Sequence, residues 1–323
     1  MATLIEVANQ AGVSKSTVSR YFNNGQVSEQ ARNKIEAAIK QTGYQPNMMA
    51  RSLKATSSHL IGVIIPRFES PAVGQMLKGI DKIATQYHQQ LLIINTNQDV
   101  KRELQALDTL AIQRVDGIVN LTQNQADTLL QKQLKLDIPQ IIMGQPYQEL
   151  SYVAFDDYQS GAQLTEAIAE KGHQKITYIG VDETDYAVGQ LRKQGVLSAA
   201  KAKHIQVDII QSTFNQQDNL PLARKVIEET TSTAILCATD HMALAFARAI
   251  GEANKQIPND IAIAGFGGYQ EGQLLHPNLT TMAYPYEQAG ELAIQYLNQL
   301  VNNKSEHPIQ ELLMPQWIEG ESL

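Results

Sequence analysis

Short apolar runs alternate with amphipathic stretches along most of this 323-residue chain, from residue 59 onward. Apolar strands separated by helices are typical of parallel sheets that are covered on both faces. The number of apolar runs is large for the strands of one sheet and fits two sheets better. The predicted strands are 60–66, 91–96, 117–122, 140–144, 176–180, 207–211, 234–238 and 261–266. The predicted helices between them are 74–87, 101–114, 158–171, 220–230 and 242–252.

The first 45 residues have a different pattern, which predicts short helices. Thr3 and Glu6 have the spacing of a capping box, in which each side chain accepts a hydrogen bond from the other residue's backbone N–H. Gly12 ends this helix, because glycine adopts a left-handed backbone without strain. Ser14 then caps a second helix, and a third helix with its own serine cap follows. Two short helices joined by a turn with glycine indicate a helix-turn-helix unit.

Charge is distributed unevenly between these two parts of the chain. The formal net charge is -7, yet residues 1–60 contain seven Lys and Arg against three Glu, which gives +4 there and -11 in the remainder. A basic segment in an acidic chain indicates a polyanionic partner. In a helix-turn-helix unit the N-terminal residues of the second helix enter the DNA major groove. Here these residues either suit base edges and phosphates or form only a polar, solvated face; they are Lys15, Ser16, Thr17, Ser19 and Arg20.

Residues 46–54 predict a further helix, which begins at Pro46. This helix is too short to be stable alone, and residues 55–58 after it have the composition of a linker. A bent DNA minor groove is one surface that would order it, with Leu53 as an apolar wedge between base steps.

Residues 3–54 carry a long ordered pattern, which includes AGVS at 11–14, TVSR at 17–20, PN at 46–47 and ARSL at 50–53. With this pattern the segment closely resembles the DNA-binding headpiece of the lactose-repressor (LacI/GalR) family. The resemblance implies base-reading positions at Lys15, Ser16 and Arg20. It implies contact with, or orientation on, backbone phosphates for Thr3, Ser14, Thr17, Ser19, Asn23 and Asn47, and entry into the minor groove for Ala50 and Leu53.

The rest of the chain resembles the effector domain of the same family, a type I periplasmic-binding-protein fold. The expected fold is therefore an all-α helix-turn-helix headpiece with a hinge helix, followed by an α/β domain of two parallel-sheet subdomains. The expected domains are a headpiece at 1–45, a hinge helix and linker at 46–58, and an effector-binding and dimerisation domain at 59–323. Its subdomains are expected at about 59–157 plus 286–314 and at about 158–285 plus 315–323.

Ligands of open parallel sheets bind at the carboxyl ends of the strands, so the residues that follow each strand are the candidates for a site. An aromatic ring for a pyranose face, with Arg, Asp and amide groups for its hydroxyls, is what a sugar site needs. Arg192 belongs to an Arg-x-x-Gly motif that matches the family's effector-binding arginine, and a buried arginine needs acceptors that a ligand supplies. The other candidates are Arg67, Phe68, Ser70, Thr122, Gln145, Phe214, Thr239, Asp240, Tyr269 and Tyr284.

Several of these residues have a structural alternative. Phe214 is either a stacking platform or part of the core. Asp240 either binds the ligand or caps the helix that follows it, and the two roles can coexist. Asp156 and Asp157 are interpreted as caps of the next helix rather than as ligand contacts.

The sequence departs from the sugar-binding members of the family at two positions. Many of them carry aspartate where this chain has Gly267, and often near Gly144. Without these two carboxylates the cleft repels an anionic ligand less, and Arg67 adds a positive charge. Segments of the effector domain look like the trehalose and sucrose operon repressors, and Arg67 falls at a phosphate-contacting position of members that sense trehalose 6-phosphate, whereas Gln145 replaces another cation there. The expected effector is a disaccharide or its phosphate, of the sucrose or trehalose type.

The expected function is a sequence-specific DNA-binding repressor of a carbohydrate-utilisation operon, whose affinity for double-stranded operator DNA is controlled by this sugar. A homodimer would place two headpieces on a pseudo-palindromic operator. The chain ends soon after Trp317 without leucine heptads, so a dimer is expected rather than a tetramer. A periplasmic-type sugar-binding receptor without catalytic activity is the alternative.

Other classes of protein are disfavoured by missing patterns. The sequence has no G-x-G-x-x-G, P-loop, H-E-x-x-H or G-x-S-x-G motif, so an enzyme is not expected. The seven histidines lack metal-ligand spacing, and neither a metal nor a cofactor is expected. There is no signal-peptide pattern and no apolar run of membrane-spanning length. One cysteine, Cys237, fits a reducing environment, so a cytoplasmic location is expected.

Overall fold

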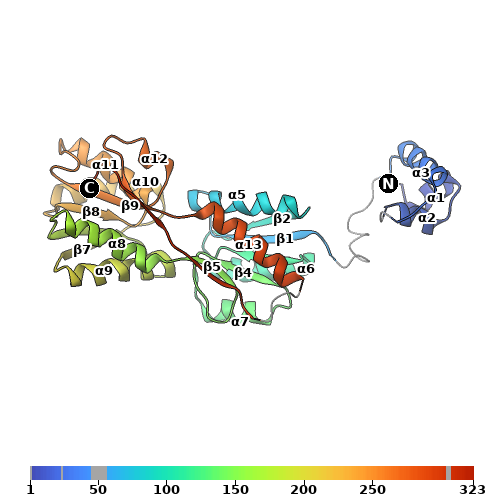
Figure 1. The fold of residues 1–323 in the computed structure, drawn as a ribbon, viewed down its shortest axis with the longest axis horizontal. Coiled ribbons are helices and arrows are strands. Elements are labelled where there is room, and N and C mark those ends of the chain that lie inside the picture. Colours follow the sequence, from blue (N-terminus) through green and yellow to red (C-terminus); the bar gives the residue numbers. More distant parts are fainter. Residues whose placement is uncertain (1, 23–24, 45–56, 303–306) are drawn as a thin grey trace. The chain divides into compact units, whose positions relative to one another are not determined.

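The computed structural model describes residues 2–22, 25–44, 57–302 and 307–323. The chain divides into two compact units, Met1–Ser58 and His59–Leu323, which are described separately (Figure 1). Four residues with expected roles in DNA binding lie outside the described residues: Asn23, Asn47, Ala50 and Leu53.

The first unit contains three helices, α1 (Leu4–Ala11), α2 (Lys15–Phe22) and α3 (Glu29–Thr42). The capping box is confirmed, because the Thr3 hydroxyl accepts from the Glu6 backbone N–H and the Glu6 carboxylate accepts from the Thr3 N–H. Serines also cap the other two helices, as the sequence predicts. A small core joins the three helices and is formed by Val7, Ala8, Ala11, Val18, Ile35 and Ala38.

The second unit contains two six-stranded sheets with the same spatial order of strands. The first has the order β11-β5-β4-β3-β1-β2 and consists of β1 (Leu60–Ile65), β2 (Gln90–Asn95), β3 (Gly117–Asn120), β4 (Gln140–Met143), β5 (Tyr152–Phe155) and β11 (Gln310–Leu313). The second has the order β12-β10-β9-β8-β6-β7 and consists of β6 (Lys175–Gly180), β7 (Gln206–Gln211), β8 (Ala234–Cys237), β9 (Ala262–Gly267), β10 (Thr280–Ala283) and β12 (Gln316–Ile318). The expectation of parallel pairing holds among the described strands except for β10 and β12, which are antiparallel.

Each sheet has its own helices, and we call the two assemblies the N-lobe and the C-lobe. The N-lobe helices are α5 (Pro71–Gln86), α6 (Val100–Gln113), α7 (Asp127–Lys135) and α13 (Tyr286–Val301). The C-lobe helices are α8 (Asp157–Glu170), the π-helix η1 (Tyr186–Arg192), α9 (Lys193–Ala202), α10 (Gln216–Glu229), α11 (Asp240–Glu252) and α12 (Gln270–Gln273). No helix in the described part of the chain is both long and apolar enough to cross a membrane.

The chain passes between the lobes three times: from β5 to α8, from β10 to α13, and from β11 to β12 (Figure 1). These passages explain why each lobe is built from segments that are far apart in the sequence. The last two strands complete different sheets although only a few residues separate them.

In each lobe, two helices approach so closely that glycines meet the opposing backbone. A Cβ atom on Gly79 of α5 would lie 2.0 Å from a carbonyl oxygen of α13, and one on Gly290 of α13 would lie 2.1 Å from a carbonyl oxygen of α5. In the C-lobe, a Cβ atom on Gly161 of α8 would lie 2.3 Å from the carbonyl oxygen of Arg192, which ends η1 and directly precedes α9, and one on Gly195 of α9 would lie 2.0 Å from a carbonyl oxygen of α8. Side chains at these four positions would force the helices apart, because close-packed backbone cannot yield.

We expect Gly79→Ala to destabilise the second unit by about 1–3 kcal/mol, because the new methyl group overlaps the backbone of α13. The matched control is Gly74→Ala in the same helix, where a Cβ atom would have nothing within 4 Å. This control should stabilise the protein by about 0.5–1 kcal/mol, since alanine favours a helix over glycine. Urea unfolding followed by circular dichroism measures both, and equal effects would contradict the close approach.

Candidate functional site

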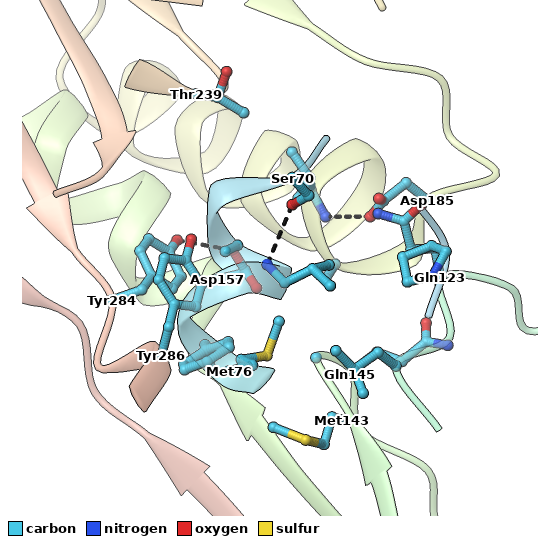
Figure 2. Close-up of a pocket in the computed structure, with 18 of the residues that line it drawn as sticks. Ser70, Met76, Gln123, Met143, Gln145, Asp157, Asp185, Thr239, Tyr284 and Tyr286 are labelled. Atoms are coloured by element: carbon cyan, nitrogen blue, oxygen red, sulfur yellow. Dashed lines mark hydrogen bonds between the residues drawn. The ribbon is translucent and has the colours of Figure 1, made fainter. Parts of the chain in front are cut away.

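A cavity lies between the two lobes, where the carboxyl ends of both sheets converge (Figure 2). Its empty space is about 730 Å³, part of which is open to solvent. The enclosed part that the centre of a water molecule can reach is smaller, about 110 Å³. Nine of the predicted effector-site residues line it: Arg67, Ser70, Thr122, Gln145, Arg192, Phe214, Thr239, Tyr269 and Tyr284.

Phe68 does not line this cavity. Its side chain is 63% exposed, and it lies in the turn between β1 and α5. The turn directs Arg67 inward, and the buried Ser70 caps α5 by accepting from the Val73 backbone N–H, so the residues between them face solvent. The prediction of Phe68 as a cavity residue is therefore not supported by its placement.

Asp240 is buried behind the cavity wall rather than in it. One carboxylate oxygen accepts from the Tyr269 backbone N–H at 2.9 Å and the other accepts from the Thr281 hydroxyl at 2.7 Å. Burial raises the pKa of Asp240 to about 6. The predicted cap role belongs to Thr239 instead, whose hydroxyl accepts from the Met242 N–H. Asp240 thus holds the loop that places the Tyr269 ring in the cavity.

A buried ion pair occupies one side of the cavity. One oxygen of Asp157 accepts from two guanidinium nitrogens of Arg192, at 2.9 and 2.5 Å, and from the Tyr284 hydroxyl at 2.8 Å. A third nitrogen of Arg192 donates to the Ala238 carbonyl at 2.5 Å. The acceptors that we expected a ligand to supply are thus provided by the chain. The cap interpretation holds for Asp156, which accepts from Gln159 N–H at 2.9 Å, and is wrong for Asp157.

Glycine at position 267 is required by the backbone of the cavity wall. Its φ is 144°, a conformation that side chains rarely adopt, and a Cβ atom there would lie 2.8 Å from the Tyr269 ring. The aspartate that many sugar-binding family members carry at this position would displace that ring. The absence of a carboxylate at position 267 therefore goes together with the presence of the Tyr269 ring in the cavity wall.

Arg67 bridges the two lobes at the other side of the cavity. It follows β1 in the N-lobe, and its guanidinium carbon lies 4.0 Å from the centre of the Phe214 ring, which follows β7 in the C-lobe. The guanidinium also donates to the Gln123 side-chain oxygen at 3.3 Å. Burial lowers the pKa of Arg67 from its ordinary value. Phe214 is only half-buried, so it serves as a platform for a cation as well as packing against the core.

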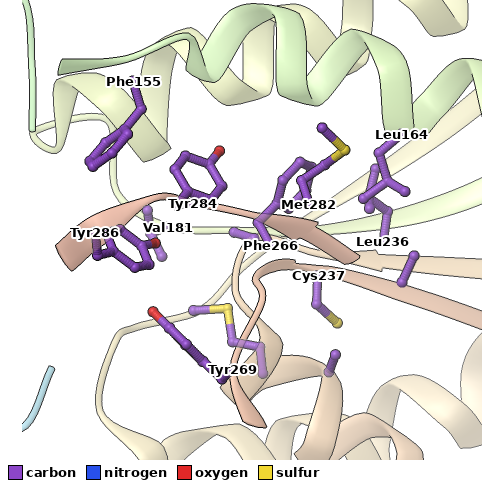
Figure 3. Packing of buried hydrophobic residues seen from close by; sticks show 14 of the residues in the cluster. Phe155, Leu164, Val181, Leu236, Cys237, Phe266, Tyr269, Met282, Tyr284 and Tyr286 are labelled. Carbon is purple, nitrogen blue, oxygen red and sulfur yellow. The ribbon is translucent and has the colours of Figure 1, made fainter. Parts of the chain in front are cut away.

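Stacked aromatic rings form the floor where the chain passes between the lobes (Figure 3). The rings of Tyr284 and Tyr286 are stacked at 5.5 Å, and Phe155 meets both edge-on at 5.3 Å. Tyr286, which like Tyr284 lies in the segment after β10, and Phe155 both line the cavity, and Phe155 was not predicted from the sequence. Both belong to the passages between the lobes, and only the pairing of distant strands brings them together.

Asp185 is the charged cavity residue that sequence reasoning missed. One of its oxygens caps η1 by accepting from the Val188 N–H at 2.8 Å, and the side chain is 6% exposed. Burial raises the pKa of Asp185 to about 6. It follows the predicted strand 176–180 by five residues, so a longer search past each strand end would have found it.

The exposed face of α2 contains the residues predicted to read bases: Lys15, Ser16 and Arg20. The Ser14 hydroxyl accepts from the Thr17 N–H at 3.2 Å and lies 2.8 Å from the hydroxyls of Ser16 and Thr17. The polar side chains at the start of this helix are therefore ordered by their own hydrogen bonds. Ser19 is half-buried, and Thr3 is exposed at the start of α1.

Comparisons with known proteins agree with this architecture. Residues 3–47 match the family model for bacterial regulatory proteins of the lacI family, and residues 165–323 match that for a periplasmic binding protein-like domain. The sucrose operon repressor of Staphylococcus xylosus is 36% identical over 305 residues, covering 94% of this chain and 95% of the relative. The ribose operon repressor of Escherichia coli is 31% identical, covering 92% of each chain.

Solved structures extend the similarity to the full fold. The lac repressor dimer bound to operator and an anti-inducer is 25% identical with a TM-score of 0.89, over 99% of this chain and 98% of that one. A complex of the transcriptional regulator CelR with cellobiose is 25% identical with a TM-score of 0.75 over the full length of both chains. The chain belongs to the lacI family of bacterial regulatory proteins, and it is a DNA-binding transcriptional regulator rather than an enzyme.

Proposed function

We propose that this protein represses a carbohydrate-utilisation operon and that a sugar bound between its lobes sets its affinity for the operator. The effector is a disaccharide or a disaccharide phosphate of the sucrose or trehalose type. The observation that carries the proposal is the cavity between the lobes, where aromatic rings and hydrogen-bonding side chains converge. The similarity to a sucrose operon repressor and to a regulator solved with cellobiose supports a disaccharide.

In this proposal the headpiece reads DNA through α2. Lys15, Ser16 and Arg20 contact base edges, and the hydroxyls ordered around Ser14 contact phosphates. The same proposal assigns phosphate contacts to Thr3, Thr17, Ser19, Asn23 and Asn47 and minor-groove contacts to Ala50 and Leu53. The protein acts in the cytoplasm as a homodimer on a pseudo-palindromic operator, with 46–58 as hinge helix and linker.

The sugar controls the operator through the arrangement of the lobes. Among the contacts that join the lobes at the cavity are Arg67 on the Phe214 ring and the Tyr186 N–H, which donates to the Gln123 carbonyl at 3.4 Å. A ligand that contacts both lobes shifts the equilibrium between two arrangements of the lobes. The size of the shift is set by the difference between its affinities for the two arrangements. In this proposal the N-lobe acts on the hinge helix and linker, because it follows them directly in the sequence. The sugar cavity and the DNA-binding headpiece would thus be coupled through two alternative arrangements of the lobes.

A periplasmic-type receptor would use the same cavity without any DNA-binding role. The capped helices of the headpiece and its match to the lacI family argue against this alternative.

Arg20→Ala should lower the affinity for an operator duplex at least tenfold, because one bidentate base contact contributes about 1–3 kcal/mol. The duplex is obtained by selection from a randomised palindromic library. Lys40→Ala is the control, since it removes an equal charge from the last turn of α3. Fluorescence anisotropy at several salt concentrations measures both variants with and without sugar. Binding that does not depend on salt, or an equal loss in both variants, would refute the proposed reading helix.

Arg67→Ala should weaken sugar binding at least tenfold, because it removes the cation at the cavity and its contact with Phe214. A thermal-shift screen of free and phosphorylated disaccharides identifies the ligand, and calorimetry then measures its affinity. Lys101→Ala, an exposed cation on α6, serves as the control. Unchanged affinity in Arg67→Ala would remove Arg67 from the effector site.

A further inference from the structure

Two buried oxygen atoms at this cavity have no hydrogen-bond partner within the described residues. They are Oδ2 of Asp185 and Oε1 of Gln145, and their side chains are 6% and 1% exposed. Both residues line the cavity, and Figure 2 shows them on the side opposite Asp157 and Tyr284. A buried acceptor without a partner costs about 1–3 kcal/mol, more when it is charged. Because both residues line the cavity, a group bound there is a candidate donor to each oxygen.

The orientation of the Gln145 amide is determined by its neighbours. Its Nε2 donates to the Asn124 carbonyl at 3.1 Å and to the Tyr147 hydroxyl at 3.4 Å, and that hydroxyl in turn donates to the same carbonyl. The reversed amide would place two oxygens against each other. Asn124 is itself held by a bond from its side-chain amide to the buried Glu103 carboxylate. The atom of Gln145 that is left without a partner is consequently an acceptor, not a donor.

Asp185 is fixed in a similar way. Its Oδ1 is occupied by the Val188 N–H, so only Oδ2 is available, and it can accept but not donate once it is ionised. A hydroxyl group donates to such an oxygen. A phosphate oxygen repels it, because the phosphate carries a charge of about -1.5 to -2 near neutral pH.

The charges of the cavity do not favour an anion. Among its described lining residues the charged side chains are Arg67, Arg192, Asp157 and Asp185, two of each sign. Asp157 and Arg192 neutralise each other. Arg67 already faces the negative field of Asp185 and of the exposed Glu69 and donates to Gln123. No surplus cation is left for a phosphate group.

We infer that Asp185 and Gln145 select an uncharged sugar over its phosphate, each accepting a hydrogen bond from a sugar hydroxyl. This inference rests on the proposed function and narrows its effector to the free disaccharide. The Arg67 guanidinium then stacks on the Phe214 ring and donates hydrogen bonds to sugar oxygens. It does not serve to neutralise a phosphate.

Calorimetry on the full-length protein at pH 7.5 tests this inference with sucrose, trehalose and the 6-phosphate of each. The wild type should bind the free form of one sugar at least tenfold more tightly than its phosphate. Asp185→Asn should weaken binding of that sugar at least tenfold and reduce the preference over the phosphate. Gln145→Leu should weaken it by a similar factor, and Asp137→Asn, on an exposed loop of the N-lobe, should not.

Thermal unfolding of the ligand-free protein separates a binding role from a structural one. A raised pKa means that the folded protein holds the proton of Asp185 more firmly than the unfolded chain, so stability is lost as the pH rises from about 4 to about 6. Asp185→Asn keeps the cap for Val188 and removes this cost. Its unfolding midpoint should exceed that of the wild type by about 3–6 °C at pH 7.5 and by less at pH 5. A purely structural Asp185 would lower the midpoint and leave the affinity unchanged.

The outcomes distinguish the two proposals. Tighter binding of a phosphorylated sugar, or unchanged affinity in both variants, overturns the selection of an uncharged sugar and leaves the repressor function intact. If no free or phosphorylated sugar binds or alters operator affinity, the proposed function fails and this inference fails with it.

Discussion

The buried ion pair between Asp157 and Arg192 ties segments of the C-lobe together beside the cavity. Asp157 lies at the first passage between the lobes and Tyr284, its second donor, lies at another, while Arg192 ends the π-helix and reaches the end of β8. Removing one partner from such a pair would leave an uncompensated buried charge, which costs several kcal/mol. Four segments that are distant in the sequence are thereby held at one point, on one side of the cavity.

Most of the fold follows from patterns that are local in the sequence. Buried central strands such as β1 and β8 read as apolar runs, and serine and glycine caps placed the headpiece helices to within a residue or two. The strands β11 and β12 could not be predicted in the same way, because they are short and partly exposed and are defined by their partners. Their pairing is long-range information that a single run of residues does not carry.

The candidate site was predictable to the extent that strand ends determine it. Reading the residues after each strand found Arg67, Gln145 and Thr239 in the cavity wall. The rule failed for Phe68, since a turn alternates inward and outward side chains, and it stopped short of Asp185. The partner of Arg192 was also hidden, because Asp157 is 35 residues away and its neighbour Asp156 caps the helix instead.

The reciprocal glycines of the two lobes have a mechanical consequence. Where backbone touches backbone, as between α5 and α13 and between α8 and α9, the helices cannot slide or tilt without steric overlap. These contacts make each helix pair stiff, so a movement of one lobe against the other would have to take place in the three short passages that join them. A small rotation of one lobe about these passages would displace the residues at its far end more than those at the cavity.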